Sequence, residues 1–141
     1  MNRTLAYSIF KRRLLVLVHT KDAPDDTEWA EYTASAGQGK KEIQGILVYS
    51  AGGGPNTMQR AQLDEAMGIE SHPAKVAVVT VSRIARGIVT AIGWFSGGIK
   101  SFGTHQLPQA IEFLGTPASD VALVTSEVAR LKKSLGIVDV L

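Results

Sequence analysis

Three short runs of this 141-residue chain are apolar at nearly every position, and they limit the folds open to it. They cover residues 14–18, 45–49 and 75–81. A strand without a polar face must be covered on both sides, as the strands of parallel α/β sheets are. Because helix-like segments separate the runs, the sequence predicts one α/β domain over residues 1–141 with a mostly parallel sheet.

The N-terminal part adds an antiparallel strand to this sheet. Residues 5–10 are β-prone and are followed by the basic triplet Lys11, Arg12 and Arg13, which predicts a hairpin into the run at 14–18. A weaker strand at 99–104 brings the total to about five. A first helix is expected after the cap-type residues at 22–26 and ends near 37–39, and further helices are expected over residues 56–67, 82–95, 108–114 and 119–135. The apolar positions of these elements predict a core of Leu15, Leu17, Trp29, Leu47, Val48, Val76, Val78, Val79, Val89, Ile92, Phe95, Val124, Val128 and Leu131.

The composition of the chain excludes or disfavours several classes of function. With 15 Lys and Arg against 13 Asp and Glu, the formal charge of +2 does not favour a nucleic-acid partner. The chain has no cysteine, which excludes disulfides, thiolate metal sites and a cysteine nucleophile. Residues 1–10 lack the apolar stretch of a signal peptide or membrane span, so we expect a cytoplasmic protein.

Polar residues follow several of the predicted strands, at the sheet edge where α/β proteins place their sites. The glycine run Gly52, Gly53 and Gly54 leads into a helix capped by Asn56 or Thr57, a geometry that can hold an anion on backbone amides. The loop lacks the Lys-Ser/Thr pair of a phosphate-binding loop, and a plain connecting loop is the simpler interpretation.

Ser50, His19, His105 and Asp22 also fall near this edge. A Ser-His-Asp triad is not favoured, because Ser50 lacks the Gly-x-Ser-x-Gly elbow. The three histidines at 19, 72 and 105 are too isolated to predict a metal site, so no catalytic residue, metal or cofactor is expected. Arg83 and Arg60 can add positive charge beside the glycine loop, although solvated surface charges are the simpler interpretation.

The element order, with the strand at 45–50 running through a loop into Asn56 and Thr57, resembles the STAS family, in its soluble SpoIIAA-like branch. The segments 24–32 and 86–95 look like those of uncharacterised bacterial STAS/SEC14-like proteins. The resemblance implies helices mainly on one face of the sheet and a non-catalytic signalling domain that binds a regulatory or kinase-like protein.

The family's partner-switching members carry an Asp-Ser-Ser-Gly motif whose first Ser is phosphorylated. Asn56 matches the Asp and Thr57 that Ser, while Met58 and Gln59 replace the second Ser and the Gly. The resemblance therefore implies Thr57 as a regulatory phosphorylation site, with Arg60 positioned to pair with the phosphate. A simple helix cap at Asn56 or Thr57 is the alternative.

The sequence thus predicts a cytoplasmic interaction or regulatory domain with no membrane span. Its alternative is a protein that binds a small anionic ligand, nucleotide or lipid through the glycine loop. The apolar stripe of the helix at 119–135 either covers the sheet or pairs two copies into a homodimer. The expected contact or anion-binding residues are Ser50, Gly52, Gly53, Gly54, Asn56, Thr57, Arg60 and Arg83.

Overall fold

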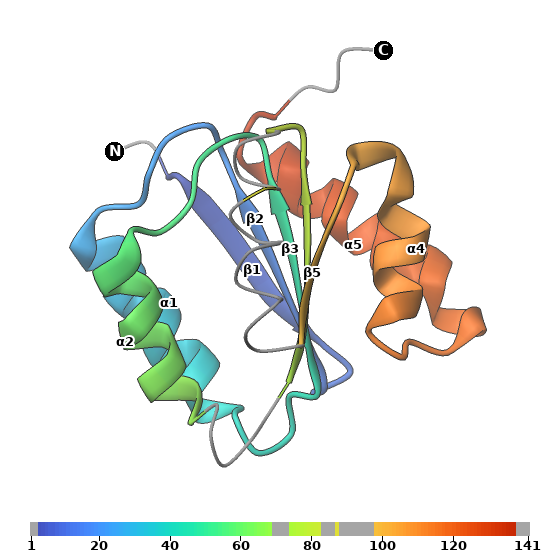
Figure 1. Cartoon of the computed structure of the whole chain (residues 1–141), viewed down its shortest axis with the longest axis horizontal. Helices are drawn as coiled ribbons and strands as arrows, with labels where there is room; N and C mark the ends of the chain where they lie inside the picture. The colour runs from blue at the N-terminus through green and yellow to red at the C-terminus, as the bar shows by residue number, and fades with distance from the viewer. Residues whose placement is uncertain (1–2, 69–73, 83–86, 88–97, 138–141) are drawn as a thin grey trace.

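A computed structural model describes residues 3–68, 74–82, 87 and 98–137, and it contains a single five-stranded sheet (Figure 1). The strands lie in the order in which the chain makes them, with β1 antiparallel to β2 and every later neighbour parallel. This confirms the predicted α/β fold class. The strands are β1 (Leu5–Phe10), β2 (Leu14–His19), β3 (Gly45–Ser50), β4 (Lys75–Thr80) and β5 (Ile99–Phe102).

The four main described helices are divided between the two faces of the sheet (Figure 1). Helices α1 (Asp26–Gln38) and α2 (Thr57–Met67) cover one face, and α4 (Leu107–Phe113) and α5 (Val121–Ser134) cover the other. The expectation of helices mainly on one face is therefore wrong for the described helices. The reason is that β2 and β3 are apolar on both faces, so each face requires its own helical cover.

Two hydrophobic clusters result, one on each side of the sheet. The α1–α2 side is built around Trp29 and Tyr32, which pack on Leu15 and Leu17 of β2. The opposite side joins alternate residues of the same strands to α4 and α5. Of the predicted core, eight residues are fully buried: Leu15, Leu17, Trp29, Leu47, Val79, Val124, Val128 and Leu131.

The other six predicted core residues are not fully buried or lie outside the described residues. Val48, Val76 and Val78 are only half-buried. Val89, Ile92 and Phe95 lie outside the described residues, as does nearly all of the helix expected after Ser82. Strand β4 ends at Thr80, and Val81, expected in the buried strand, is 59% exposed.

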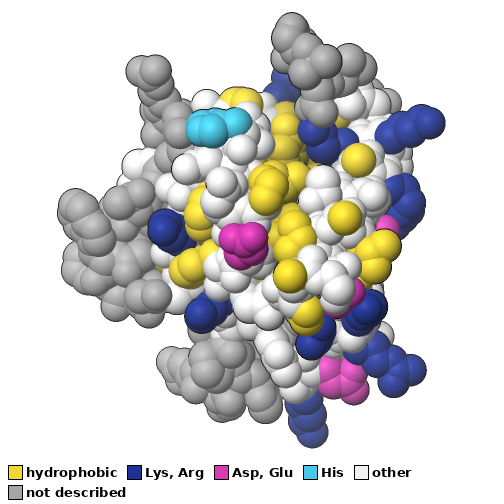
Figure 2. Space-filling model, turned by 90° about the vertical axis from the view of Figure 1, so that its right-hand side faces the viewer, with side chains coloured by type: hydrophobic (Ala, Val, Ile, Leu, Met, Phe, Trp, Pro, Cys, Tyr) yellow, Lys and Arg dark blue, Asp and Glu magenta, His cyan; other side chains and the backbone are white. Residues whose placement is uncertain are grey.

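The apolar stripe of α5 covers the sheet, which is the simpler of its two predicted roles. Val124, Val128 and Leu131 are buried against it. Figure 2 views the α4–α5 side and shows hydrophobic side chains scattered among polar ones, with Lys and Arg side chains along the margins. Two copies could pair through this stripe only if α5 moved away from the sheet, which would expose the core.

The β1–β2 turn contains two consecutive residues in the left-handed backbone region, Lys11 at φ 49° and Arg12 at φ 63°. Arg13 closes it by donating its N–H to Phe10 O at 3.1 Å. Asp120, itself buried, accepts from Lys11 Nζ at 2.8 Å and Arg13 Nη2 at 3.4 Å, and so ties the turn to the start of α5. These contacts hold a backbone that non-glycine residues adopt only at a cost.

This turn predicts a stabilising substitution. Arg12→Gly should raise the free energy of unfolding by about 0.5–1 kcal/mol, because glycine adopts a positive φ without a steric penalty. Urea unfolding measures the change. Arg12→Ala is the matched control, since it removes the same charge but keeps the strain. Equal stabilisation by both variants would show that charge, and not backbone conformation, is responsible.

Candidate functional site

The candidate site lies at the carboxyl edge of the parallel strands, where the loops after β2 and β3 run side by side. His19 and Ser50 end these two strands and are paired in the register of the sheet. Beyond them, Ala51 donates its N–H to His19 O at 3.0 Å, so the two loops begin in contact. The edge therefore places the predicted glycine loop directly against residues 20–22.

Ser50 is part of the loop framework. Its Oγ donates to Gly53 O at 2.5 Å and accepts from Gly52 N–H at 3.0 Å. The residue is only 5% exposed. Ser50 is therefore buried, and its hydroxyl holds the loop in place. The prediction that it lies on the contact surface is wrong.

Gly53 is required by a close backbone approach. Its N–H donates to Thr20 O at 2.9 Å. A Cβ at this position would lie 2.4 Å from Asp22 O and 2.6 Å from Thr20 O, well inside contact distance. Gly54 differs, since a Cβ there would meet no atom of the described residues within 4 Å. Gly53 thus serves the packing of the two loops, a role that the sequence alone did not identify.

Asn56 and Gln59 fix the start of α2 through a capping box. Asn56 Oδ1 accepts from Gln59 N–H at 2.8 Å, and Gln59 Oε1 accepts from Asn56 N–H at 3.0 Å. The helix cap predicted at Asn56 or Thr57 is Asn56. The spacing Asn-x-x-Gln is the sequence signal for this motif.

Gln59 also joins α2 to α1, although sequence analysis assigned it no role. It is 2% exposed, and its Nε2 donates to Pro24 O and to Asp26 Oδ1, both at 3.1 Å. Its backbone carbonyl accepts from Trp29 Nε1 at 2.8 Å. Trp29 is a core residue of α1, so these bonds hold the starts of both helices in one rigid unit.

Exposed side chains project from this fixed helix start. Asn56 and Thr57 are exposed, and Met58 is 73% exposed. Arg60 Nη2 donates to Thr57 Oγ1 at 3.2 Å, so Arg60 lies beside the hydroxyl on which the resemblance implied a phosphate. Arg83 lies outside the described residues, so its place relative to this group stays a prediction.

His19 is buried beneath the same edge. It is 1% exposed and stacks on Trp29 with ring centroids 6.2 Å apart and an interplanar angle of 18°. Its Nδ1 has no hydrogen-bond partner among the described residues. Burial lowers the pKa of His19 to about 4, although the nearby Glu28 carboxylate acts in the opposite direction. His19 is thus a neutral core residue at physiological pH.

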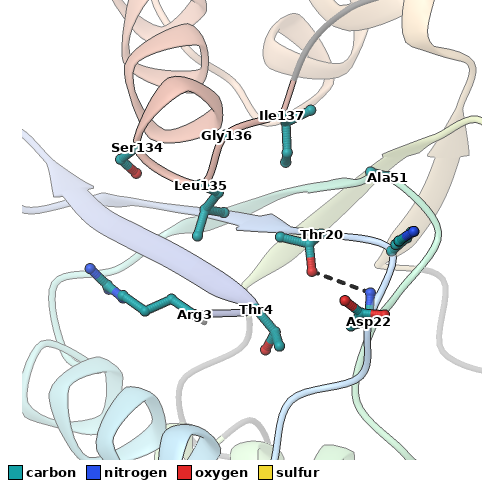
Figure 3. A pocket seen from close by; sticks show the side chains of 10 residues that line it. Arg3, Thr4, Thr20, Asp22, Ala51, Ser134, Leu135, Gly136 and Ile137 are labelled. Carbon is teal, nitrogen blue, oxygen red and sulfur yellow. Dashed lines mark hydrogen bonds between the residues drawn. The ribbon is translucent and has the colours of Figure 1, made fainter. Parts of the chain in front are cut away.

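An open pocket of about 750 Å³ lies across residues 20–22 from the glycine loop (Figure 3). One wall comes from the strand ends and the other from the last turn of α5. Gly136, at φ 71°, reverses the chain there, and Ile137 N–H donates back to Lys132 O at 3.0 Å. Sequence analysis missed this pocket because its walls come from opposite ends of the chain. The lining residues are Arg3, Thr4, Thr20, Lys21, Asp22, Ala51, Ser134, Leu135, Gly136 and Ile137.

The described part of the chain offers neither a metal site nor a membrane-spanning helix. Among these residues, no group of three His, Asp or Glu side chains is arranged to hold a metal ion. Within the same residues, every helix is too short or too polar to cross a bilayer.

Comparison with known proteins does not assign the chain to a family. The chain matches no protein-family model, and no curated protein is significantly similar to it.

The loop contact predicts different outcomes for two neighbouring glycines. Gly53→Ala should lower the free energy of unfolding by about 2–3 kcal/mol, because the new methyl group overlaps two backbone carbonyl oxygens. Gly54→Ala is the control and should change stability little, since space is open there. Chemical denaturation of both variants tests this prediction, and equal effects would contradict it.

The buried His19 predicts a loss of stability in mild acid. Because its folded-state pKa is lowered from 6.5 to about 4, the unfolded state binds its proton first as the pH falls. Stability from this group is therefore complete above about pH 6.5 and declines towards pH 4, by at most about 3 kcal/mol. His19→Leu should flatten this part of the curve of unfolding free energy against pH. Parallel curves for the variant and the wild type would contradict the prediction.

Proposed function

We propose that this protein is a non-catalytic, cytoplasmic interaction domain of STAS type that binds a regulatory protein through the start of α2. The observation that carries the proposal is the combination of a rigid backbone and exposed side chains at that position. Asn56, Gln59 and Trp29 immobilise the helix start, while Thr57 and Met58 face solvent. Preorganised exposed groups bind with a smaller loss of conformational entropy.

Apolar exposure at this edge supports a protein partner. Within the described residues, four large hydrophobic side chains are exposed, and two of them, Met58 and Val81, follow the adjacent strands β3 and β4. Methionine is a frequent contact residue because its flexible thioether adapts to a partner surface. A protein interface at the carboxyl edge would cover both side chains.

Thr57 supplies a candidate switch for this interface. Its hydroxyl already accepts from Arg60, in the first turn of α2 where the helix dipole is positive. A phosphate on Thr57 would keep the Arg60 contact and add about −1.5 to −2 charge beside Met58. We infer that phosphorylation would change the affinity for the partner, as the resemblance to partner-switching proteins implies.

The alternative, an anion held by the glycine loop, has less support from the geometry. Gly52 N–H is bonded to Ser50 Oγ and Gly53 N–H to Thr20 O. An anion cradle needs such amides to be free. Native mass spectrometry of purified protein tests this alternative directly, because a retained ligand would appear as added mass.

The interface predicts a position-specific loss of binding. Affinity capture from the native cell should recover a protein with the wild type and lose it with Met58→Asp, since a buried charge without a partner opposes association. Leu123→Asp is the matched control, because Leu123 is 52% exposed on α5 and should retain the partner. Equal recovery by both variants, or no specific protein with the wild type, would refute this surface.

The proposed phosphorylation switch predicts that two Thr57 variants differ in their affinity for the partner. With the captured partner in hand, Thr57→Glu should change its affinity by about tenfold or more, while Thr57→Ala should stay close to the wild type. Titration calorimetry measures both. Both variants should fold normally, because Asn56 is the cap and Thr57 is not. Unchanged affinity for Thr57→Glu would refute the switch at Thr57.

A further inference from the structure

Strand β1 forms one edge of the sheet, since β2 is its only neighbouring strand in the described part of the chain. Open edge strands pair with other strands, and monomeric proteins protect them with charges, proline, a bulge or a short length. β1 has six residues without charge or proline, and it pairs with β2 in unbroken register. By contrast, β5 at the other edge is four residues long and carries Lys100. The β1 edge therefore lacks these protective features.

The backbone groups that β1 turns outwards follow from its pairing with β2. Thr20 N–H donates to Thr4 O at 2.9 Å, so Thr4 and Thr20 are a hydrogen-bonded pair of the antiparallel ladder. Such pairs alternate along the two strands, so every second residue of β1 directs its N–H and C=O groups away from β2. These residues are Leu5, Tyr7 and Ile9.

Tyr7 and Ile9 leave this edge open. The third outward residue is engaged, because Leu5 N–H donates to Glu28 Oε2 at 3.3 Å. No hydrogen bond from another described segment reaches the outward N–H and C=O groups of Tyr7 and Ile9. The Ile9 side chain is also 38% exposed. Among the described residues, two consecutive outward positions of β1 are thus available to a further strand.

From these observations we propose that two copies of this chain pair their β1 edges antiparallel, around a two-fold axis at Ser8. Tyr7 of each copy then faces Ile9 of the other, and every free N–H and C=O group of these residues is bonded. The ladder ends beyond them, because Leu5 N–H is bonded to Glu28 and Lys11, at φ 49°, has left the strand conformation. The product is a closed dimer with one continuous sheet.

Charges beside the strand favour this register. A two-fold axis at Ser8 places Arg12 of one copy opposite Thr4 of the other. Thr4 N–H donates to Glu28 Oε2 at 2.8 Å, so the exposed Arg12 of one copy comes close to the Glu28 carboxylate of the other. Arg12 forms no ion pair with any described side chain of its own copy. The register thus joins opposite charges twice, once on each side of the axis.

A shifted register loses these contacts. An axis at Tyr7 would place Lys11 of one copy opposite Arg3 of the other, and like charges at opposed positions repel. The same shift would also require the Leu5 N–H that Glu28 already binds. Both effects select the axis at Ser8.

Single cysteines test this axis, because the chain has no cysteine of its own. Ser8→Cys places the thiols of both copies at the axis, so mild oxidation should form a covalent dimer at least about tenfold faster than with Met58→Cys, which reports chance collision. Ile9→Cys is the matched control within β1, since it faces Tyr7 of the other copy, and it should link slowly. Electrophoresis without reductant measures the rates. Equal rates for Ser8→Cys and Met58→Cys would overturn the inference.

The mass of the purified protein is the second test. Sedimentation equilibrium should show a dimer at about 100 µM wild-type protein, and Ile9→Lys should weaken it at least about tenfold, since a charge on an edge strand opposes pairing. Arg12→Glu, in the exposed turn, should also weaken it, whereas Lys100→Glu on the opposite edge should not.

A wild type that is monomeric at this concentration would overturn the inference, whether the edge stays open or binds a strand of another protein. A dimer that neither Ile9→Lys nor Arg12→Glu weakens would overturn it as well. Both tests use the purified chain alone, so the inference can fail independently of the partner proposed for the start of α2.

Discussion

Strand β2 has no polar face, and the rest of the structure depends on this constraint. All six of its residues are buried, so the strand needs neighbours at both edges and cover on both faces. β1 and β3 supply the edges, α1 covers one face, and α5 covers the other. Its end also emerges at the centre of the carboxyl edge, between the glycine loop on one side and the pocket on the other.

Polar residues at this edge divide into those that hold the backbone and those that remain exposed. Ser50, Gln59 and the backbone of Thr20 are used in contacts between loops and helices. Thr57, Met58 and Arg60 extend from the surface that those contacts fix. The backbone contact at Gly53 joins the wall of the pocket to the proposed partner surface.

Within the part of the chain that the structure describes, two buried side-chain atoms on the α1 side of the core have no hydrogen-bond partner: His19 Nδ1 and the Tyr32 hydroxyl. Such atoms each cost about 1–3 kcal/mol. Close aromatic packing offsets part of this cost, since Tyr32 lies 5.1 Å from Tyr7 and 5.0 Å from Trp29 between ring centroids. Burial raises the pKa of Tyr32 and lowers that of His19, so both side chains remain neutral near pH 7.

Local patterns in the sequence determined the strands, most helix boundaries and the hairpin, because a strand or helix needs only its own spacing of apolar residues and its caps. They also placed Arg60 beside Thr57, which is a contact within one helical turn. Only the tertiary structure decided the division of helices between two faces, the burial of His19 and Ser50, and the role of Gly53. It alone brought Arg3 beside Leu135 and Ile137 in one pocket. These features depend on how distant elements pack together, and no periodicity within a single element contains that information.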